Sequence, residues 1–402
     1  MLFYINIMLL RKTVVQWLNY DSNHYFWYFP AKSDNGHAPV VLWLQGGPGG
    51  SSLFGLFTEI GPLVASEDGI SVRDFHWALN YHLIFIDNPV GTGFSFTSND
   101  KGYCNDEDCV AADLYSSLTQ FFQMFPHINS NDFYISGESY AGKYIPALAM
   151  KIHKENKNEI KINLKGLAMG NAYCDPINQL DYGKYLYQHG LLDAQQAGLF
   201  ELVQNKIKIE IEKENWEAAD ILMDKLMDGI FSNISYFKMF TGYNNYYNYL
   251  QPTSNDLDMT VFAEMLKKDN IRKAVHVGNL PFNSGDKVQI HLAFDVLKSV
   301  APLVGDLLSS YKVILYNGQL DIIVAYPLTE KFVKNLNFSS SAEYKNAIRH
   351  IWFVDEEIAG YVKVAGNLTE VLVRDAGHMV PHDQPKWAYD MITRFIGGKN
   401  FW

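Results

Sequence analysis

A serine in a turn of small residues is the strongest candidate for chemistry in this sequence. Ser139 lies in the run Gly-Glu-Ser-Tyr-Ala-Gly, between the strand-like Phe133–Ser136 and a helix-like stretch from Ala141 to Lys154. A sharp strand-to-helix turn of this kind projects a serine hydroxyl above a sheet as a nucleophile. The residues two positions away must be small, and Gly137 and Ala141 are, although the alanine departs from a G-x-S-x-G pattern.

A serine hydroxyl is a weak nucleophile, so it requires a histidine base that a carboxylate orients. In hydrolases built on this turn, the acid and then the histidine follow the serine along the chain. Asp321 follows the strand-like Val313–Tyr316, and His378 follows Val371–Val373. The order predicts a catalytic triad of Ser139, Asp321 and His378.

Other side chains near these positions suggest alternatives. Asp355 also follows a strand-like run, whereas Asp375 lies only three residues before His378, too close in sequence to support its far ring nitrogen comfortably. His378 and His382 have the spacing of a metal-binding pair, but Pro381 between them disfavours a shared helix face. We therefore predict no metal and no cofactor.

A glycine-rich loop follows the strand-like Val40–Leu44, with the sequence Gln-Gly-Gly-Pro-Gly-Gly-Ser-Ser from Gln45. Such a loop can aim backbone N–H groups at an anion. It lacks the Lys-Ser/Thr of a Walker loop and the G-x-G-x-x-G spacing of a dinucleotide site. With a serine nucleophile downstream, the better use is an oxyanion hole, for which we predict the amides of Gly47 and Tyr140.

Four long motifs occur in a fixed order: GGPGGSS, DNPVGTGFS, GESYAGKYIP and AGHMVPHDQP. Together they resemble the serine carboxypeptidase family of α/β-hydrolases over nearly the whole chain. FWYFPA, WLQGGPGGSS and YNGQLDIIVA make the sequence most similar to the vitellogenic-carboxypeptidase-like branch. The resemblance implies a serine-type carboxypeptidase that releases C-terminal residues from peptides through an acyl-enzyme.

The resemblance also implies a site for the substrate's terminal carboxylate, made by Gln45, Glu138 and Glu59. The family has Asn where this chain has Gln45, which keeps the amide donor but adds a methylene, so the site should shift slightly. Two close, partly buried carboxyl groups should have raised pKa values, and they bind a carboxylate only while they hold a proton. We therefore expect the best activity at acidic pH.

Three further departures from the family pattern concern structure around the site. Gly50 stands where the family has Cys, Asp375 stands where it commonly has Gly, and the middle of the chain lacks the usual Cys pairs. The extra carboxylate of Asp375 near His378 is expected to raise the pKa of that base.

The elements that must position these residues are short apolar runs alternating with helical stretches, which predicts a mostly parallel sheet flanked by helices. The middle differs, because Gln195–Leu226 is helical and charged and is followed by the aromatic, Asn-rich loop Tyr243–Tyr249. We predict an α/β-hydrolase core from residues 1–173 and 285–402, with residues 174–284 forming an inserted helical cap. The remaining strand-like runs are Tyr25–Phe29, Leu83–Ile86 and Gly166–Met169.

Composition limits the partners. The chain has 402 residues, 48% of them hydrophobic, which is typical of a globular enzyme, and a net charge of −11. An acidic chain without a basic stripe disfavours nucleic acid and anionic membranes. The substrates expected are the C-termini of peptides or proteins, and the oligomeric state stays open, with a dimer among the states allowed.

Of the three cysteines, Cys104 and Cys109 are close enough to pair, but three free thiols, Cys174 included, are the favoured interpretation.

The ends and surface of the chain bear on its location. Met1–Leu10 is apolar but too short to span a bilayer, and it lacks a preceding positive charge and a clear cleavage site, so a signal segment and a plain strand are equally favoured. Three N-glycosylation sequons begin at Asn233, Asn337 and Asn367. With the family resemblance they favour a lysosomal or extracellular location in the secretory pathway, and we interpret the N-terminus as incomplete.

Two other functions are kept as alternatives. An acyltransferase would use the same acyl-enzyme and pass the acyl group to an alcohol. A catalytically inactive binding or storage protein would keep the scaffold alone, which the intact triad disfavours.

Overall fold

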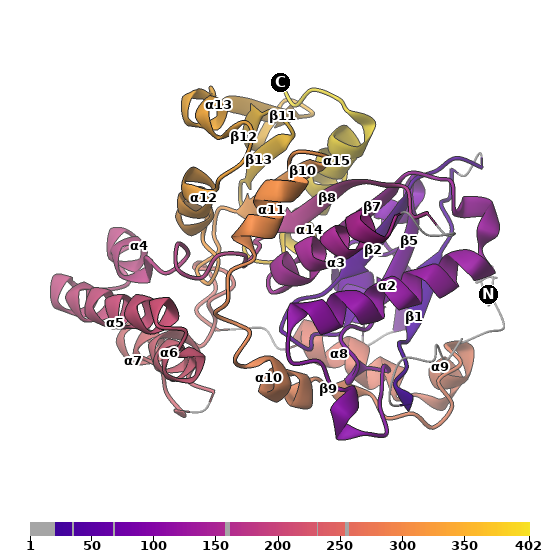
Figure 1. The fold of residues 1–402 in the computed structure, drawn as a ribbon, viewed down its shortest axis with the longest axis horizontal. Helices are drawn as coiled ribbons and strands as arrows, with labels where there is room; N and C mark the ends of the chain where they lie inside the picture. Colours follow the sequence, from indigo (N-terminus) through magenta and orange to yellow (C-terminus); the bar gives the residue numbers. More distant parts are fainter. Residues whose placement is uncertain (1–20, 34–35, 67–68, 157–160, 231, 254–256) are drawn as a thin grey trace.

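A nine-stranded sheet forms the centre of the computed structural model (Figure 1), which describes residues 21–33, 36–66, 69–156, 161–230, 232–253 and 257–402. The predicted segment Met1–Leu10 lies outside the described residues. The strands from β5 to β13 in spatial order pair in parallel, and antiparallel strands complete both edges. Every strand expected from the sequence is present, so the predicted mostly parallel sheet is confirmed. In spatial order the strands are β1 (Phe26–Phe29), β5 (His82–Ile86), β2 (Val40–Leu44), β7 (Phe133–Glu138), β8 (Leu164–Gly170), β10 (Lys312–Gly318), β13 (Leu368–Val373), β12 (Glu357–Ala365) and β11 (His350–Val354).

Helices cover both faces of the sheet, which explains why the central strands are continuous apolar runs. Along β2, Val40 and Leu42 pack on one face, while Val41 and Trp43 pack on the other, and all four are fully buried. This alternation follows from the two-residue period of a strand. The first face is covered by α2 (Glu107–Met124), α3 (Ala141–Glu155) and α11 (Ala301–Leu307), and the second by α8 (Leu257–Leu266), α14 (Val380–Asp383) and α15 (Pro385–Gly397).

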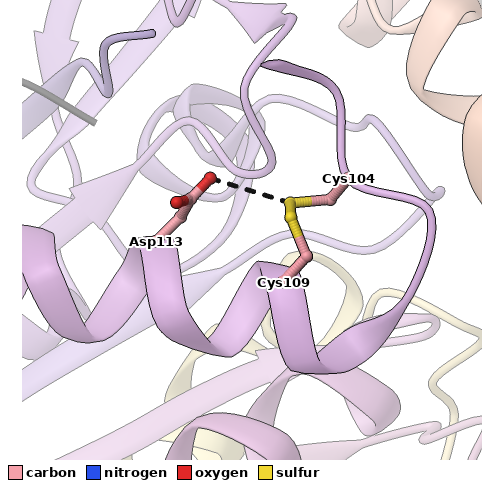
Figure 2. Close-up of side chains that lie close together, drawn as sticks. All are labelled: Cys104, Cys109 and Asp113. Carbon is pink, nitrogen blue, oxygen red and sulfur yellow. Dashed lines mark hydrogen bonds between the residues drawn. A yellow bond between two sulfur atoms is a disulfide. The ribbon is translucent and has the colours of Figure 1, made fainter. Parts of the chain in front are cut away.

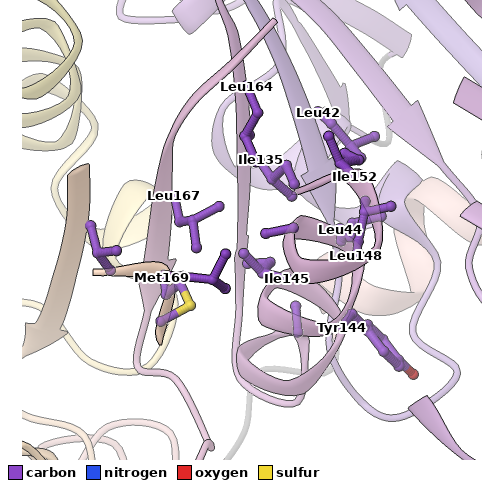
Figure 3. Close-up of a cluster of buried hydrophobic side chains, with 14 of the residues drawn as sticks. Leu42, Leu44, Ile135, Tyr144, Ile145, Leu148, Ile152, Leu164, Leu167 and Met169 are labelled. Atoms are coloured by element: carbon purple, nitrogen blue, oxygen red, sulfur yellow. The ribbon is translucent and has the colours of Figure 1, made fainter. Parts of the chain in front are cut away.

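Helix α3 carries the turn of the candidate nucleophile and is anchored by an apolar face (Figure 3). Its residues Ile145, Leu148 and Ile152 pack against Leu42 of β2 and Ile135 of β7, and all are fully buried. Burial of one such side chain contributes about 1.5–3 kcal/mol. The start of α3 is therefore held firmly against the carboxyl ends of the strands.

One carbonyl of α3 is bonded by a thiol. Pro146 lies inside the helix and has no N–H for the Gly142 carbonyl one turn earlier. The Cys174 thiol fills that place, since its Sγ lies 3.2 Å from the Gly142 oxygen and donates to it. Cys174 is free and fully buried, as expected for a structural thiol.

The middle of the chain forms helices that lie to one side of the sheet in Figure 1. They pack around an apolar cluster that includes Phe200, Leu226 and Phe237, and residues 322–328 after β10 contribute to the same cluster. By contrast, Phe262 of α8 packs with Phe54 and Phe57 of the core, although it falls within the segment predicted as a cap. The division at residues 174 and 284 stays a prediction. The helices of the side cluster are α4 (Tyr182–Gln188), α5 (Ala194–Glu212), α6 (Trp216–Met223) and α7 (Tyr236–Thr241).

Short elements complete the chain. They are α1 (Ser52–Phe54), β3 (Leu63–Ser66), β4 (Gly69–Val72), β6 (Thr92–Gly93), α9 (Asp269–Ala274), β9 (Asn283–Ser284), α10 (Asp286–Leu292), α12 (Tyr326–Asn335) and α13 (Ser341–Asn346). Among the described helices, none combines the length and the apolar character that crossing a bilayer requires.

A disulfide joins Cys104 and Cys109 (Figure 2), so the expectation of three free thiols is wrong for these two. The loop brings their Cα atoms to 5.5 Å, within the range that a disulfide spans. Asp106 caps α2 inside this loop by accepting from Cys109 N at 2.9 Å. The Asp113 carboxyl lies 3.7 Å from Cys104 Sγ, but the bonded sulfurs offer no thiolate to a metal.

Candidate active site

The turn at Ser139 has the strained backbone that a projecting nucleophile requires. Its φ is +61°, in the left-handed region, which costs about 1–3 kcal/mol for a residue other than glycine. Three main-chain bonds hold it there: Ser139 N donates to Gly170 O at 2.9 Å, and Ser139 O accepts from Gly142 N and Tyr173 N at 2.9 and 3.0 Å. Ser139 is half-buried, between the buried Glu138 and Tyr140, so a substrate can reach its hydroxyl.

Small residues around Ser139 are required by close packing. A Cβ on Gly137 would overlap the Leu44 carbonyl oxygen and lie 3.0 Å from Ala141 Cβ. The alanine therefore meets the steric requirement, as the sequence suggested.

Asp321 and His378 are brought together at the carboxyl end of the sheet. Asp321 Oδ2 lies 2.8 Å from His378 Nδ1 and also accepts from Asn171 Nδ2 at 2.6 Å, while Oδ1 accepts from Ile323 N at 3.0 Å. Both members of the pair are almost completely buried. Because the carboxylate favours a proton on Nδ1, the lone pair of the neutral ring lies on Nε2. That nitrogen is buried and has no hydrogen-bond partner among the described residues, so it can accept a proton from a nucleophile.

The rival carboxylates lie elsewhere. Asp355 pairs with Lys386 at 2.8 Å on the surface. The Asp375 carboxylate is 59% exposed and lies 3.4 Å from Arg374, so its charge is partnered by a cation at the surface. Its φ of +52° explains why glycine suits this position in the similar family.

The glycine-rich loop lies against the nucleophile turn. A Cβ on Gly46 would be 2.7 Å from both Ser139 Cβ and Tyr140 N, so only glycine fits there. The backbone next to Gly47 is thus placed beside the Tyr140 amide, as the predicted oxyanion hole requires.

Asp87, which the sequence analysis did not assign, fastens the glycine-rich loop to the turn after β5. Its carboxylate accepts from Ser51 Oγ at 2.5 Å and from Phe94 N at 2.8 Å. Burial raises the pKa of Asp87 to about 6. Asp87 could have been identified from the sequence, because it is the first residue of the motif DNPVGTGFS and directly follows an apolar strand.

Gln45, Glu138 and Glu59 form a buried polar group beside Ser139. Gln45 Nε2 donates to Glu138 Oε1 at 2.6 Å, and Gln45 Oε1 accepts from Trp43 Nε1 at 2.9 Å. The indole therefore fixes the orientation of the amide, with its donor toward Glu138. Glu59 is fully buried at the end of the π-helical turn Gly55–Glu59, and its charge acts on Glu138.

Burial makes both carboxyl groups harder to ionise. Burial raises the pKa of Glu59 to about 7, against a smaller opposing effect of its contact with Glu138. Burial, and then the charge of Glu59, raise the pKa of Glu138 well above its usual range. Because the pKa values of both groups are raised, we expect the pair to hold at least one proton in acid.

A second buried ionic group lies behind Tyr140. Lys143 is fully buried and donates to Asp295 Oδ2 at 2.8 Å, and the Tyr140 hydroxyl lies 3.4 Å from the same oxygen. Glu107 is also buried here, and burial raises its pKa to about 8. Glu107 and Asp295 are distant in sequence from Lys143, so no local spacing of residues could have revealed this ionic group.

All three glycosylation candidates, Asn233, Asn337 and Asn367, are exposed, and the side chains of Asn233 and Asn337 make no hydrogen bond to another described residue. Asn367 is exposed as a residue, but its side-chain amide donates to Leu308 O at 2.9 Å.

Comparison with known proteins agrees with this geometry. The family model described as "Serine carboxypeptidase" matches residues 14–398. The venom serine carboxypeptidase of Apis mellifera is 50% identical over 95% of this chain and 83% of its own, and the probable serine carboxypeptidase CPVL of Homo sapiens is 49% identical over 95% and 82%. The vitellogenic carboxypeptidase of Aedes aegypti is 48% identical over 94% and 80%.

Among solved structures, Kex1, a prohormone-processing carboxypeptidase from Saccharomyces cerevisiae, superposes with a TM-score of 0.83 at 24% identity, covering 97% of this chain and 90% of that one. That likeness establishes the α/β-hydrolase fold expected from the sequence. The named relatives favour a peptide hydrolase over an acyltransferase or an inactive scaffold. The chain belongs to the serine carboxypeptidase family.

Proposed function

We propose that Ser139, His378 and Asp321 cleave the last peptide bond of a substrate through an acyl-enzyme. Ser139 Oγ attacks the carbonyl carbon while His378 Nε2 takes its proton, and the amides of Gly47 and Tyr140 hold the oxyanion. His378 then gives the proton to the leaving amino acid, and water repeats the sequence to release the shortened peptide. Asp321 keeps the proton on Nδ1 and stabilises the imidazolium as it forms.

The observation that carries the carboxypeptidase assignment is the pair of buried carboxyl groups beside the nucleophile, Glu138 and Glu59, with Gln45 bonded to Glu138. A substrate carboxylate approaching Glu138 and Glu59 is attracted only while the pair holds a proton to donate. Gln45 Nε2 supplies a further donor on the same side, fixed in direction by Trp43. Recognition of the C-terminus should therefore weaken as the pair ionises, which predicts an enzyme that works best in acid.

The test compares a peptide free acid with its C-terminal amide between pH 4 and 8. The free acid should be preferred near pH 5, and its kcat/KM should fall by up to about tenfold per pH unit once the pair loses its proton. Equal cleavage of the two substrates would refute carboxylate recognition. Labelling of the parent protein by a fluorophosphonate, abolished in Ser139→Ala, tests the nucleophile separately, and an unlabelled parent would favour the inactive scaffold.

The proposed location is the secretory pathway, in a lysosomal or extracellular compartment. Relatives named for venom and vitellogenic proteins support it, as do the exposed sequons at Asn233 and Asn337. Expression in secreting cells should give a protein whose mass falls on treatment with an N-glycosidase. The shift should shrink in Asn233→Gln and Asn337→Gln, and an unshifted parent would contradict the assignment.

A further inference from the structure

The aromatic, Asn-rich loop Tyr243–Tyr249, here called the aromatic strap, lies across the loop that carries Asp321. Tyr246 O accepts from Ile322 N at 3.1 Å and from Ile323 N at 3.2 Å, and Tyr249 N donates to Leu320 O at 2.9 Å. These three bonds bracket the carboxylate-bearing residue on both sides. Residues Leu320–Ile323 are thus fixed by main-chain bonds from a segment outside the sheet.

The next carbonyl of the strap holds the base. His378 N donates to Tyr247 O at 2.7 Å, and the Tyr247 ring centroid lies 5.1 Å from that of His378. A Cβ on Gly377 would overlap Tyr247 O and lie 2.9 Å from Asn248 Cβ, so the strap and the histidine loop are in direct contact. Neighbouring carbonyls of one rigid peptide segment therefore bind the acid loop and the base loop.

Two buried asparagines make the strap rigid. Asn245 Oδ1 accepts from Tyr247 N at 2.9 Å, and Asn245 Nδ2 donates to Gln251 O at 2.9 Å. Asn248 Oδ1 accepts from Leu250 N at 3.0 Å. Such side-chain bonds to the backbone two residues on fix a turn without helix or sheet, which accounts for the Asn-rich composition.

We propose that the aromatic strap is a positioning element that sets the separation of Asp321 and His378. The inference rests on the proposed function, since it assumes that these two residues act as a pair. The sheet alone delivers them on separate loops after β10 and β13, and the strap bonds to both. If the strap moves, the 2.8 Å bond between carboxylate and imidazole lengthens, and the imidazolium loses part of its stabilisation.

The test is Asn245→Ala in the full chain, with Asn244→Ala as the matched control, because Asn244 is the adjacent residue and is exposed. Active sites are counted with a fluorophosphonate, and kcat and KM are measured per active site across pH 4–8. Asn245→Ala should lower kcat by about 10- to 100-fold, the cost of misplacing a reacting group by about 1 Å. KM should change little.

Loss of folded protein alone would reduce the number of titrated sites but would leave kcat per site unchanged. That result, or a change confined to KM, overturns the proposal. Where Asn245→Ala does not fold, Asn248→Ala is measured in the same way, and a parental kcat per site in that variant would equally overturn it. If the proposed function itself is wrong, the parent protein will neither be labelled nor cleave peptides. If only the role of the strap is wrong, the parent will be active and the variants will keep its kcat.

Discussion

Replacing Glu59 by Gln should change how the stability of the protein depends on pH. Glu59 is fully buried, and burial raises its pKa from 4.5 to about 7. The folded state thus keeps this proton in a range where the unfolded chain has already released it. The free energy of unfolding therefore falls as pH rises from about 4.5 to 7, and the loss is complete above pH 7.

The size of the loss follows from the two pKa values. A difference of one pKa unit corresponds to about 1.4 kcal/mol, so the shift of Glu59 amounts to about 3 kcal/mol. Glutamine has nearly the same shape and cannot ionise. It also removes the charge that raises the pKa of Glu138, so Glu138 should ionise more easily in the variant. This second effect also weakens the pH dependence of the variant's stability.

The assay is denaturant unfolding of the parent and of Glu59→Gln at pH 4.5, 6 and 7.5. Between the two extremes the parent should lose about 3 kcal/mol more than the variant. Glu201→Gln is the control, because Glu201 is exposed on α5 and its removal should leave the pH dependence unchanged. Parallel losses in the parent and Glu59→Gln would refute the reasoning about the buried carboxyl pair.

Three further substitutions test the site. Gly46→Ala should lower the rate of fluorophosphonate labelling by at least about tenfold, because its Cβ would lie 2.7 Å from Tyr140 N; a parental rate would contradict the required close packing. Asn171→Ala removes a 2.6 Å bond to Asp321, the proposed catalytic acid, and should raise the activation free energy for kcat/KM by about 1.5–3 kcal/mol. Steady-state kinetics measure this change, and an unchanged kcat/KM would show that the bond is dispensable. Lys143→Met removes the nearer of the two cations paired with Asp295, which keeps Lys298 at 3.4 Å, and should cost about 1.5–3 kcal/mol of unfolding free energy; a loss below about 0.5 kcal/mol would oppose this view.

Much of the fold could be predicted because short sequence patterns indicate its strands. Continuous apolar runs such as Val40–Leu44 are found only where a strand is covered on both faces, and each run led to a loop bearing a polar residue of the site. The turn at Ser139 was equally local, since steric demands act on residues two positions apart. Fold and candidate nucleophile therefore followed from short segments.

What the patterns could not supply are contacts between distant segments. Asn171 binds Asp321 across 150 residues, and Lys143 pairs with Asp295 across 152, with no periodicity that links the partners. The aromatic, Asn-rich composition of the strap could be recognised in the sequence. Its bonds to the loops after β10 and β13 could not, because they depend on how distant segments pack together. The disulfide was missed for another reason: Cys104 and Cys109 are close in sequence, but the loop conformation decides whether they meet.

The thiol that bonds to the Gly142 carbonyl inside α3 has a practical consequence for labelling. Of the three cysteines, two are joined in a disulfide, and burial raises the pKa of the third, Cys174, so that it offers no thiolate to a reagent at neutral pH. A cysteine introduced at an exposed position of the chain would therefore react alone. Placed at the exposed position of Asn244, it would attach a single fluorophore or spin label next to Asn245 of the aromatic strap, with no need to remove any native cysteine.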